Sequence, residues 1–119
     1  MRYRIRKFKG SLIIELNGKA QPDESVRARW VLSPFLRRPG VKAILYLAGL
    51  RKIDIRELEV LEVIRKEVKT QRGTLRLCAL RDDLRAKFDR NPFLRVYELY
   101  DDLESSLSEM PDLPLRRSA

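Results

Sequence analysis

The sequence of 119 residues contains no histidine and a single cysteine, Cys78. Without histidine, the protein has no imidazole that could act as a general base, accept a phosphoryl group or bind zinc. A lone thiol cannot form an intramolecular disulfide, and Cys78 lies in an apolar run, which is typical of a small buried side chain. The five glycines never have the spacing of a phosphate-binding loop. We therefore expect no catalytic residue, no metal site and no cofactor.

Long hydrophobic runs are missing as well. No apolar stretch approaches the roughly 20 residues that a membrane-spanning helix needs, and no secretory hydrophobic region follows the basic N-terminus. The length suits one domain. We expect a cytoplasmic protein without a membrane span.

Charge, by contrast, is abundant: charged residues make up 36% of the chain, and the formal net charge is +9. With only two asparagines and two glutamines, this composition is typical of heat-adapted proteins. The first ten residues contain five cations, Arg2, Arg4, Arg6, Lys7 and Lys9. Such a segment could follow a nucleic-acid backbone or an anionic membrane surface. We favour the solvated face of a charged edge strand, because no aromatic stacking set or recognition helix accompanies it.

The hydropathy pattern alternates between predicted strands and helices with short connections. Tyr3 and Ile5 alternate with arginines, and a turn at residues 9–11 leads into a second apolar strand, which predicts an opening hairpin. The continuously apolar runs at residues 43–48 and 75–80 indicate buried parallel strands, and residues 96–100 predict a short fifth strand.

Helix boundaries are indicated by proline and by acidic residues. Pro34 predicts a kink or a restart in the first helix, because proline disrupts a helix interior. Asp54 and Glu57 have the spacing of a capping box at the start of the second helix, and Asp101 and Glu104 repeat that spacing before the last helix.

The predicted fold is therefore one α/β domain with the order β-β-α-β-α-β-α-β-α. It has a mostly parallel sheet of about five strands, an opening hairpin and four helices. The domain is predicted to cover residues 1–110. Because Pro111 and Pro114 end regular structure, residues 111–119 are predicted to form an irregular tail.

From Gly18 to about Leu107 the chain resembles the STAS domain, the family of sulfate transporters and anti-sigma factor antagonists. The element order matches throughout. The matching segments are the turn Leu16-Asn17-Gly18, the joint Leu50-Arg51-Lys52-Ile53-Asp54 before a capped helix, Gly73 ahead of Leu75-Arg76-Leu77, and Tyr100-Asp101-Asp102 before the last helix. The resemblance implies a bacterial regulatory module that acts through protein contacts and is not an enzyme.

The chain departs from this family at the phosphorylation site. In members that act as switches, the second helix starts with a sequence resembling D-S-S-G-L, whose first serine accepts phosphate from a partner kinase. Aligned on Asp54 and Leu58, this chain has Ile55 at the acceptor position, and isoleucine has no hydroxyl group. Two acids that the family often carries nearby correspond to Gln21 and Tyr46. Of the motif only Asp54 remains, and helix capping is enough to account for it.

The resemblance also implies where a partner binds: the start and outer face of the second helix, with a histidine-kinase-like anti-sigma factor as one such partner. The predicted partner-binding residues are Asp54, Ile55, Arg56, Glu59, Val60, Glu62 and Val63. Val60 and Val63 are equally compatible with a wider buried helix face. Leu58, Leu61 and Val68 are predicted core residues, and a homodimer is compatible with the sequence.

Two alternatives remain open from the sequence. One is a nucleic-acid- or nucleotide-binding α/β domain that uses the basic N-terminal strand, and the other is an auxiliary subunit of a transporter. The transporter subunit would share the fold and differ only in its partner. Identification of the bound partner would separate all three hypotheses.

Overall fold

The chain opens with an antiparallel hairpin formed by β1 (Arg2–Phe8) and β2 (Ser11–Asn17), as the alternating pattern predicts. This computed structural model describes residues 1–108; the predicted domain end at residue 110 and the tail 111–119 lie outside the described residues. The turn between the strands contains Lys9 and Gly10, both with positive φ (49° and 82°). A two-residue turn with this backbone matches the right-handed twist of the strands that it joins.

The remaining strands join the sheet in parallel, giving the order β1-β2-β3-β4-β5. They are β3 (Lys42–Tyr46), β4 (Thr74–Cys78) and β5 (Glu98–Tyr100). The helices are α1 (Glu24–Leu36), α2 (Ile55–Thr70), α3 (Asp82–Arg90) and α4 (Leu103–Ser108), with a 3₁₀ helix, η1 (Pro92–Val96), before β5. The predicted single α/β domain with an opening hairpin is confirmed.

Three boundaries differ from the sequence prediction. α1 continues through Pro34 and ends at Leu36. Proline removes one backbone N–H, so only one carbonyl in the helix loses its usual donor. Val96 lies in η1 rather than in β5, because the Asn91 side chain accepts a hydrogen bond from the Phe93 N–H (3.0 Å) and starts a tight turn there. Asp102, not Asp101, caps α4 by accepting from the Ser105 N–H (2.8 Å).

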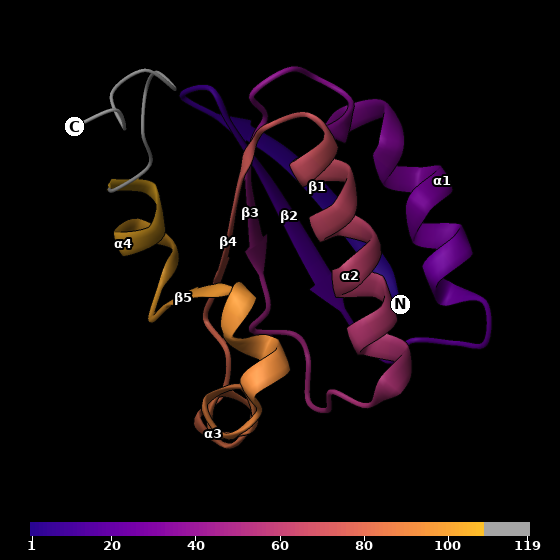
Figure 1. The fold of residues 1–119 in the computed structure, drawn as a ribbon, viewed down its shortest axis with the longest axis vertical. Coiled ribbons are helices and arrows are strands. Elements are labelled where there is room, and N and C mark those ends of the chain that lie inside the picture. Colours follow the sequence, from indigo (N-terminus) through magenta and orange to yellow (C-terminus); the bar gives the residue numbers. More distant parts are fainter. Residues whose placement is uncertain (109–119) are drawn as a thin grey trace.

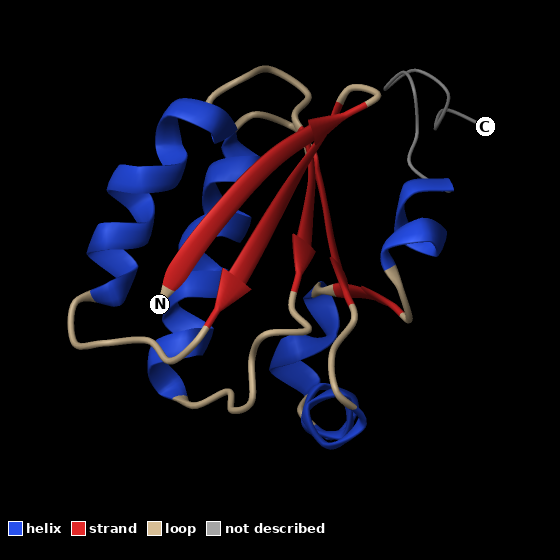
Figure 2. Ribbon diagram, turned by 180° about the vertical axis from the view of Figure 1, so that it is seen from behind, coloured by secondary structure: helices blue, strands red, loops and turns tan. Residues whose placement is uncertain are grey.

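The helices are unevenly distributed over the two faces of the sheet. α1 and α2 pack side by side over one face, whereas α4 lies against β3, β4 and β5 (Figures 1 and 2). On that opposite face the Arg76 guanidinium donates to the Ser106 carbonyl (3.1 Å) and to Glu98 (3.1 Å), and it lies over the Tyr100 ring. No helix within residues 1–108 is both long and apolar enough to cross a bilayer.

The core lies between the sheet and the α1–α2 pair. Alternate residues of β2 and β3 face these helices and are buried, and they meet apolar side chains from one stripe of each helix. The main contributors are Leu12, Ile14, Leu16, Ala43, Leu45, Leu32, Leu36, Leu61 and Ile64. Since each fully buried Leu or Ile side chain contributes about 1.5–3 kcal/mol, this layer fixes the positions of α1 and α2 on the sheet.

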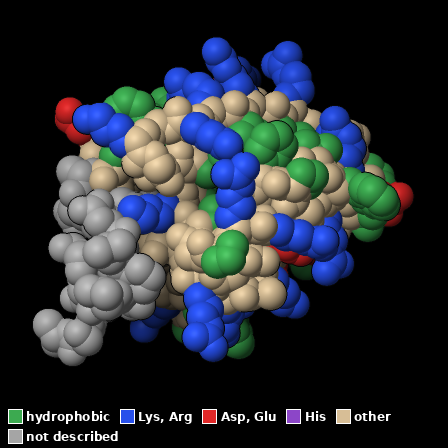
Figure 3. Space-filling model, turned by 90° about the horizontal axis from the view of Figure 1, so that it is seen from above, with side chains coloured by type: hydrophobic (Ala, Val, Ile, Leu, Met, Phe, Trp, Pro, Cys, Tyr) green, Lys and Arg blue, Asp and Glu red, His purple; other side chains and the backbone are tan. Residues whose placement is uncertain are grey.

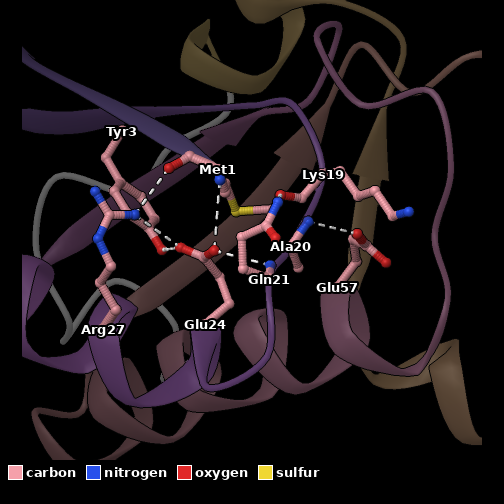
Figure 4. A network of polar contacts seen from close by, with 8 residues as sticks. All are labelled: Met1, Tyr3, Lys19, Ala20, Gln21, Glu24, Arg27 and Glu57. Carbon is pink, nitrogen blue, oxygen red and sulfur yellow. Dashed lines mark hydrogen bonds and ion pairs between the residues drawn. The ribbon is translucent and has the colours of Figure 1, made fainter.

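A buried carboxylate, Glu24, ties the start of α1 to the N-terminal strand (Figure 4). Glu24 is only 3% exposed and accepts hydrogen bonds from the Tyr3 hydroxyl, the Gln21 N–H (3.0 Å) and the Arg27 guanidinium (3.0 Å), beside the amino group of Met1 (3.4 Å). Burial opposes ionisation, but these donors outweigh it, so the pKa of Glu24 lies below its ordinary value. The ionised carboxylate therefore stabilises the fold.

We expect Glu24→Gln to lower the free energy of unfolding by about 1–3 kcal/mol at pH 7, because the buried network loses its negative charge and one of its two acceptor oxygens. The folded-state pKa lies below the unfolded value of about 4.3, so this stabilisation is complete above that pH and is lost as the pH falls through the folded pKa. Urea unfolding at a series of pH values should show the difference between the two proteins shrinking as the pH falls below about 4.3. Glu59→Gln, at an exposed position, is the control, and a gap independent of pH would contradict the assignment.

Candidate interaction site at the start of helix α2

The start of α2 lies at the end of the sheet where the parallel strands finish. β2 and β3 are in register, with Glu15 level with Tyr46, so the loops that follow them leave from the same edge (Figure 1). The Gly18 N–H donates to the Gly49 carbonyl (3.3 Å) and joins these two loops. A Cβ at Gly49 would lie 1.8 Å from the Asn17 side-chain oxygen, so any other residue there would displace the Asn17 side chain.

Glu57 fixes the first turn of α2 against the loop after β2. One carboxylate oxygen accepts from the Asp54 N–H (2.9 Å), which confirms the predicted capping box. The other oxygen accepts from the Ala20 N–H (2.8 Å), as Figure 4 shows. Glu57 is 3% exposed, and hydrogen bonds to a charged group contribute about 1.5–3 kcal/mol each. The helix start and the β2 loop are therefore held as one rigid unit.

Four of the predicted partner-binding residues form an exposed surface on this unit, which we call the α2 patch: Asp54, Ile55, Arg56 and Glu59. Ile55 is 72% exposed, although it is the most apolar of the four. The Asp54 carboxylate lies 3.5 Å from the Lys52 ammonium, whereas Arg56 and Glu59 have no ion pair within residues 1–108. The patch thus has an apolar centre surrounded by charges of both signs.

The prediction that Val60 belongs to this surface is wrong. Val60 is fully buried and belongs to the core together with Leu61 and Ile64. The physical reason is that the buried stripe of α2 is two residues wide, because the helix lies in the angle between the sheet and α1 and is covered from both sides. Val63 is half-buried at the border of this stripe.

Glu62 is predicted as a binding residue but is engaged within the fold. Its carboxylate accepts two hydrogen bonds from Arg65 (3.0 and 2.6 Å) and one from the Tyr97 hydroxyl (3.0 Å). The Arg65 hydrogen bond is the main reason why the pKa of Glu62 lies below its ordinary value. Glu62 thus links α2 to the segment before β5.

The two residues that replace family acids differ in their position. Gln21 is exposed in the loop after β2, next to the residue that Glu57 holds. Tyr46 is half-buried on the sheet face away from α2, since it alternates with Leu45, which faces the helices. The structure therefore places Gln21 at the same end as the patch and does not bring Tyr46 towards Ile55.

Within residues 1–108 no group of three or more Asp, Glu or Cys side chains could hold a metal ion. Cys78 is buried, and burial raises the pKa of its thiol to about 11, which keeps it protonated at neutral pH. An open hollow of about 440 Å³ lies beside the helix start, with Ile53, Leu58 and Phe88 among its lining residues.

Sequence reasoning missed two of the residues that shape this site. The role of Glu57 in binding the Ala20 N–H depends on a contact between residues 37 positions apart, and no local sequence pattern predicts such a contact. Glu24 is likewise an unremarkable acid in the first turn of a helix, where the helix dipole already favours one. The sequence predicts only the hydrogen bond between Glu57 and the Asp54 N–H, because a capping box has a fixed spacing.

Comparisons with known proteins agree on the fold. The model of the STAS domain matches residues 5–106. TM1081 from Thermotoga maritima, assigned as an anti-sigma factor antagonist, has a TM-score of 0.75 and 18% identity, covering 91% of this chain and 93% of that chain. A variant of RsbS from Moorella thermoacetica in which a serine is replaced by glutamate has a TM-score of 0.72 and 14% identity, covering 92% and 94% of the two chains.

A third similar structure is the Bacillus cell fate determinant SpoIIAA in its phosphorylated form. Its TM-score is 0.62 at 14% identity, and the match covers 91% of this chain and 97% of that chain. Among curated proteins, none matches the sequence. At these identities the structures establish a shared fold, while the family model covers most of the sequence directly. The match of the family model shows that the chain belongs to the STAS domain family.

Proposed function

We propose that this protein is a non-catalytic interaction module of the anti-sigma factor antagonist type, which binds a regulatory protein through the α2 patch. The observation that carries this proposal is the 72% exposure of Ile55 at the first turn of a helix whose start is held rigidly by Glu57. A preformed apolar centre with charged neighbours is the arrangement found at protein interfaces.

Folding does not account for Ile55 at this position. An exposed isoleucine contributes little to the stability of the fold because its side chain is not buried. Its β-branched side chain also has a lower helix propensity than alanine or leucine. A partner that covers Ile55 would recover the transfer free energy of its side chain, about 1.5–3 kcal/mol on full burial. Asp54, Arg56 and Glu59 would then set the orientation of the partner, because charges at the edge of an interface act on specificity and association rate.

We further propose that binding is independent of phosphorylation at the family position. Among the similar structures, SpoIIAA is described in its phosphorylated form, and RsbS carries glutamate in place of a serine. In the alignment of this chain with the family motif on Asp54 and Leu58, the acceptor position corresponds to Ile55, and its neighbours Arg56 and Glu57 also have no hydroxyl group. The module would therefore be constitutively ready to bind.

The basic N-terminal strand supports a nucleic-acid function less well. Arg2, Arg4 and Arg6 are exposed on one face of β1, and Arg6 pairs with Glu15 of β2 (3.1 Å). Their alternate neighbours Tyr3 and Ile5 pack against the core. This is the arrangement expected of a half-buried edge strand whose outer face is solvated.

We expect Ile55→Ser to weaken partner binding about 5–30-fold, which corresponds to about 1–2 kcal/mol, while the free energy of unfolding changes by no more than about 0.5 kcal/mol. Immobilised wild-type and variant proteins would be used to capture partners from the source lysate, and the affinity of the retained protein would then be measured. Val26→Ser, an exposed β-branched residue of α1 (57% exposed), is the matched control. If both variants bind as tightly as the wild type, the binding surface lies elsewhere.

Arg56→Glu should act differently, by slowing association and altering its salt dependence with little effect on folding. Stopped-flow or surface-based kinetics with the captured partner would separate the association and dissociation rates. A change confined to the dissociation rate, with unchanged salt dependence, would show that Arg56 is not at the edge of the interface.

Incubation with a serine kinase of the partner class and ATP should leave the intact mass of the wild-type protein unchanged. Ile55→Ser supplies a hydroxyl group beside Asp54 and serves as the positive control for the kinase. A phosphate found on another serine or threonine of the wild type, together with altered partner binding, would contradict constitutive binding.

The rigidity of the patch depends on Glu57, and its loss should be visible at two amides together. In Glu57→Ala, hydrogen exchange at Ala20 and Asp54 should accelerate in parallel, because one side chain holds both N–H groups and alanine retains no acceptor. The free energy of unfolding should fall by about 1.5–3 kcal/mol. Glu59→Ala removes the same charge from the same helix without a hydrogen-bond loss. Protection that persists at either amide would show that Glu57 does not couple the helix start to the β2 loop.

A further inference from the structure

The end of the sheet opposite the α2 patch collects cations from three separate connections. These are the β1–β2 turn, the α1–β3 loop and the α2–β4 turn. Hydrogen bonds from the Gly40 N–H to the Gln71 carbonyl (2.7 Å) and from the Thr74 N–H to the Val41 carbonyl (2.8 Å) join two of them. The strand register places Lys7 level with Leu12, and Leu12 level with Ala43, so the hairpin turn lies at the same end.

We call this surface the basic end. Its exposed cations are Lys7, Lys9, Arg37, Arg38, Lys66, Lys69 and Arg72. Viewed from above, as in Figure 3, Lys and Arg side chains spread across this end with hydrophobic side chains between them. In the segments 7–11, 37–42 and 66–74 the one acid is Glu67, which is largely buried and pairs with Arg29 (3.6 Å) and Arg37 (3.4 Å). The other six cations have no ion pair within residues 1–108.

Helix stability accounts for only part of this concentration. Cations near the C-terminal ends of α1 and α2 interact favourably with the helix dipoles, and this interaction accounts for Arg37 and Lys69. Lys9 and Arg72 are different: both have positive φ (49° and 55°) at turns where glycine or asparagine would be less strained. The turns thus carry a cation where folding alone favours another residue.

An aromatic side chain accompanies the cations. Phe8, at the tip of the hairpin, is 47% exposed, and the Lys9 ammonium lies 5.4 Å from the centre of its ring. An aromatic ring flanked by lysines is suited to the boundary between lipid headgroups and acyl chains, where the ring enters the apolar side and the ammonium stays with the phosphates.

We propose that the basic end binds the surface of a bilayer that contains anionic lipids. The cations reach outward on long side chains, and the helix ends behind them present carbonyl groups rather than N–H groups. A discrete phosphate is usually seated by helix N-termini, so this end lacks the backbone donors of a seated-phosphate site. A diffuse negative surface potential needs no such donors. A molecule bound in this way would direct the α2 patch away from the membrane, towards a protein partner.

The test is co-sedimentation with vesicles of phosphatidylcholine alone and of phosphatidylcholine and phosphatidylglycerol in equal parts. The wild-type protein should bind only the anionic vesicles, and more weakly as salt is added. The variant Lys7→Gln, Lys9→Gln, Arg38→Gln and Arg72→Gln should lose about fivefold in affinity for each cation removed, or about 600-fold in total. Phe8→Ser should weaken binding further at unchanged charge.

The matched control removes four exposed cations from the opposite end, all outside the α2 patch: Lys19→Gln, Arg51→Gln, Lys87→Gln and Arg90→Gln. This control should bind within about threefold of the wild type, because surface attraction falls off within a Debye length. Equal losses in both quadruple variants would mean that net charge alone drives binding and would overturn the assignment. So would tight, salt-sensitive binding to a duplex oligonucleotide without vesicle binding. Circular dichroism and urea unfolding confirm that every variant is folded.

Discussion

The carboxylate of Glu57 is the constraint on which the geometry of the α2 patch depends. It satisfies the Asp54 N–H at the start of α2 and the Ala20 N–H in the loop after β2. Because Ala20 is buried, its N–H would otherwise be left without a partner. Leu61, Ile64 and Val68 in the core fix α2 along its length. Because Glu57 also fixes the first turn, the start of the helix cannot move independently of the rest. The exposed residues at that turn are consequently presented in one geometry, and a partner need not order them on binding.

The parts of this arrangement that sequence predicts are those with a local period or spacing. Apolar alternation in β1, continuous apolar runs in β3 and β4, and the Asp54–Glu57 spacing each depend on residues close in the chain, and the fold and the helix start follow from them. The Val60 prediction was wrong because helical periodicity indicates one buried stripe but not its width. That width depends on α1, which packs beside α2 and covers a second row.

Long-range polar contacts are the part that sequence could not supply. Glu24 and Glu57 are both acids near a helix start, where the helix dipole alone favours an acid. Each is nevertheless only 3% exposed and accepts a hydrogen bond from another part of the chain. Their partners, Tyr3 and Ala20, are 21 and 37 positions away. The same limit applies to α4, where Asp102 rather than Asp101 accepts from the helix, since Asp101 instead pairs with Arg85 of α3.

The two ends of the domain follow from its topology. In a sheet with right-handed crossovers the helices start where the parallel strands end, so one end has positive helix dipoles and the other negative ones. Cations at the basic end partly follow this field, as Lys69 at the last turn of α2 shows. Arg56 does not follow this field, because it lies in the first turn of α2, where the helix dipole favours an acid. Its neighbour Ile55 is exposed and therefore contributes little to the stability of the fold. Neither residue stabilises the helix that carries it, and the proposed contact with a partner that covers this rigidly held turn would account for their combination.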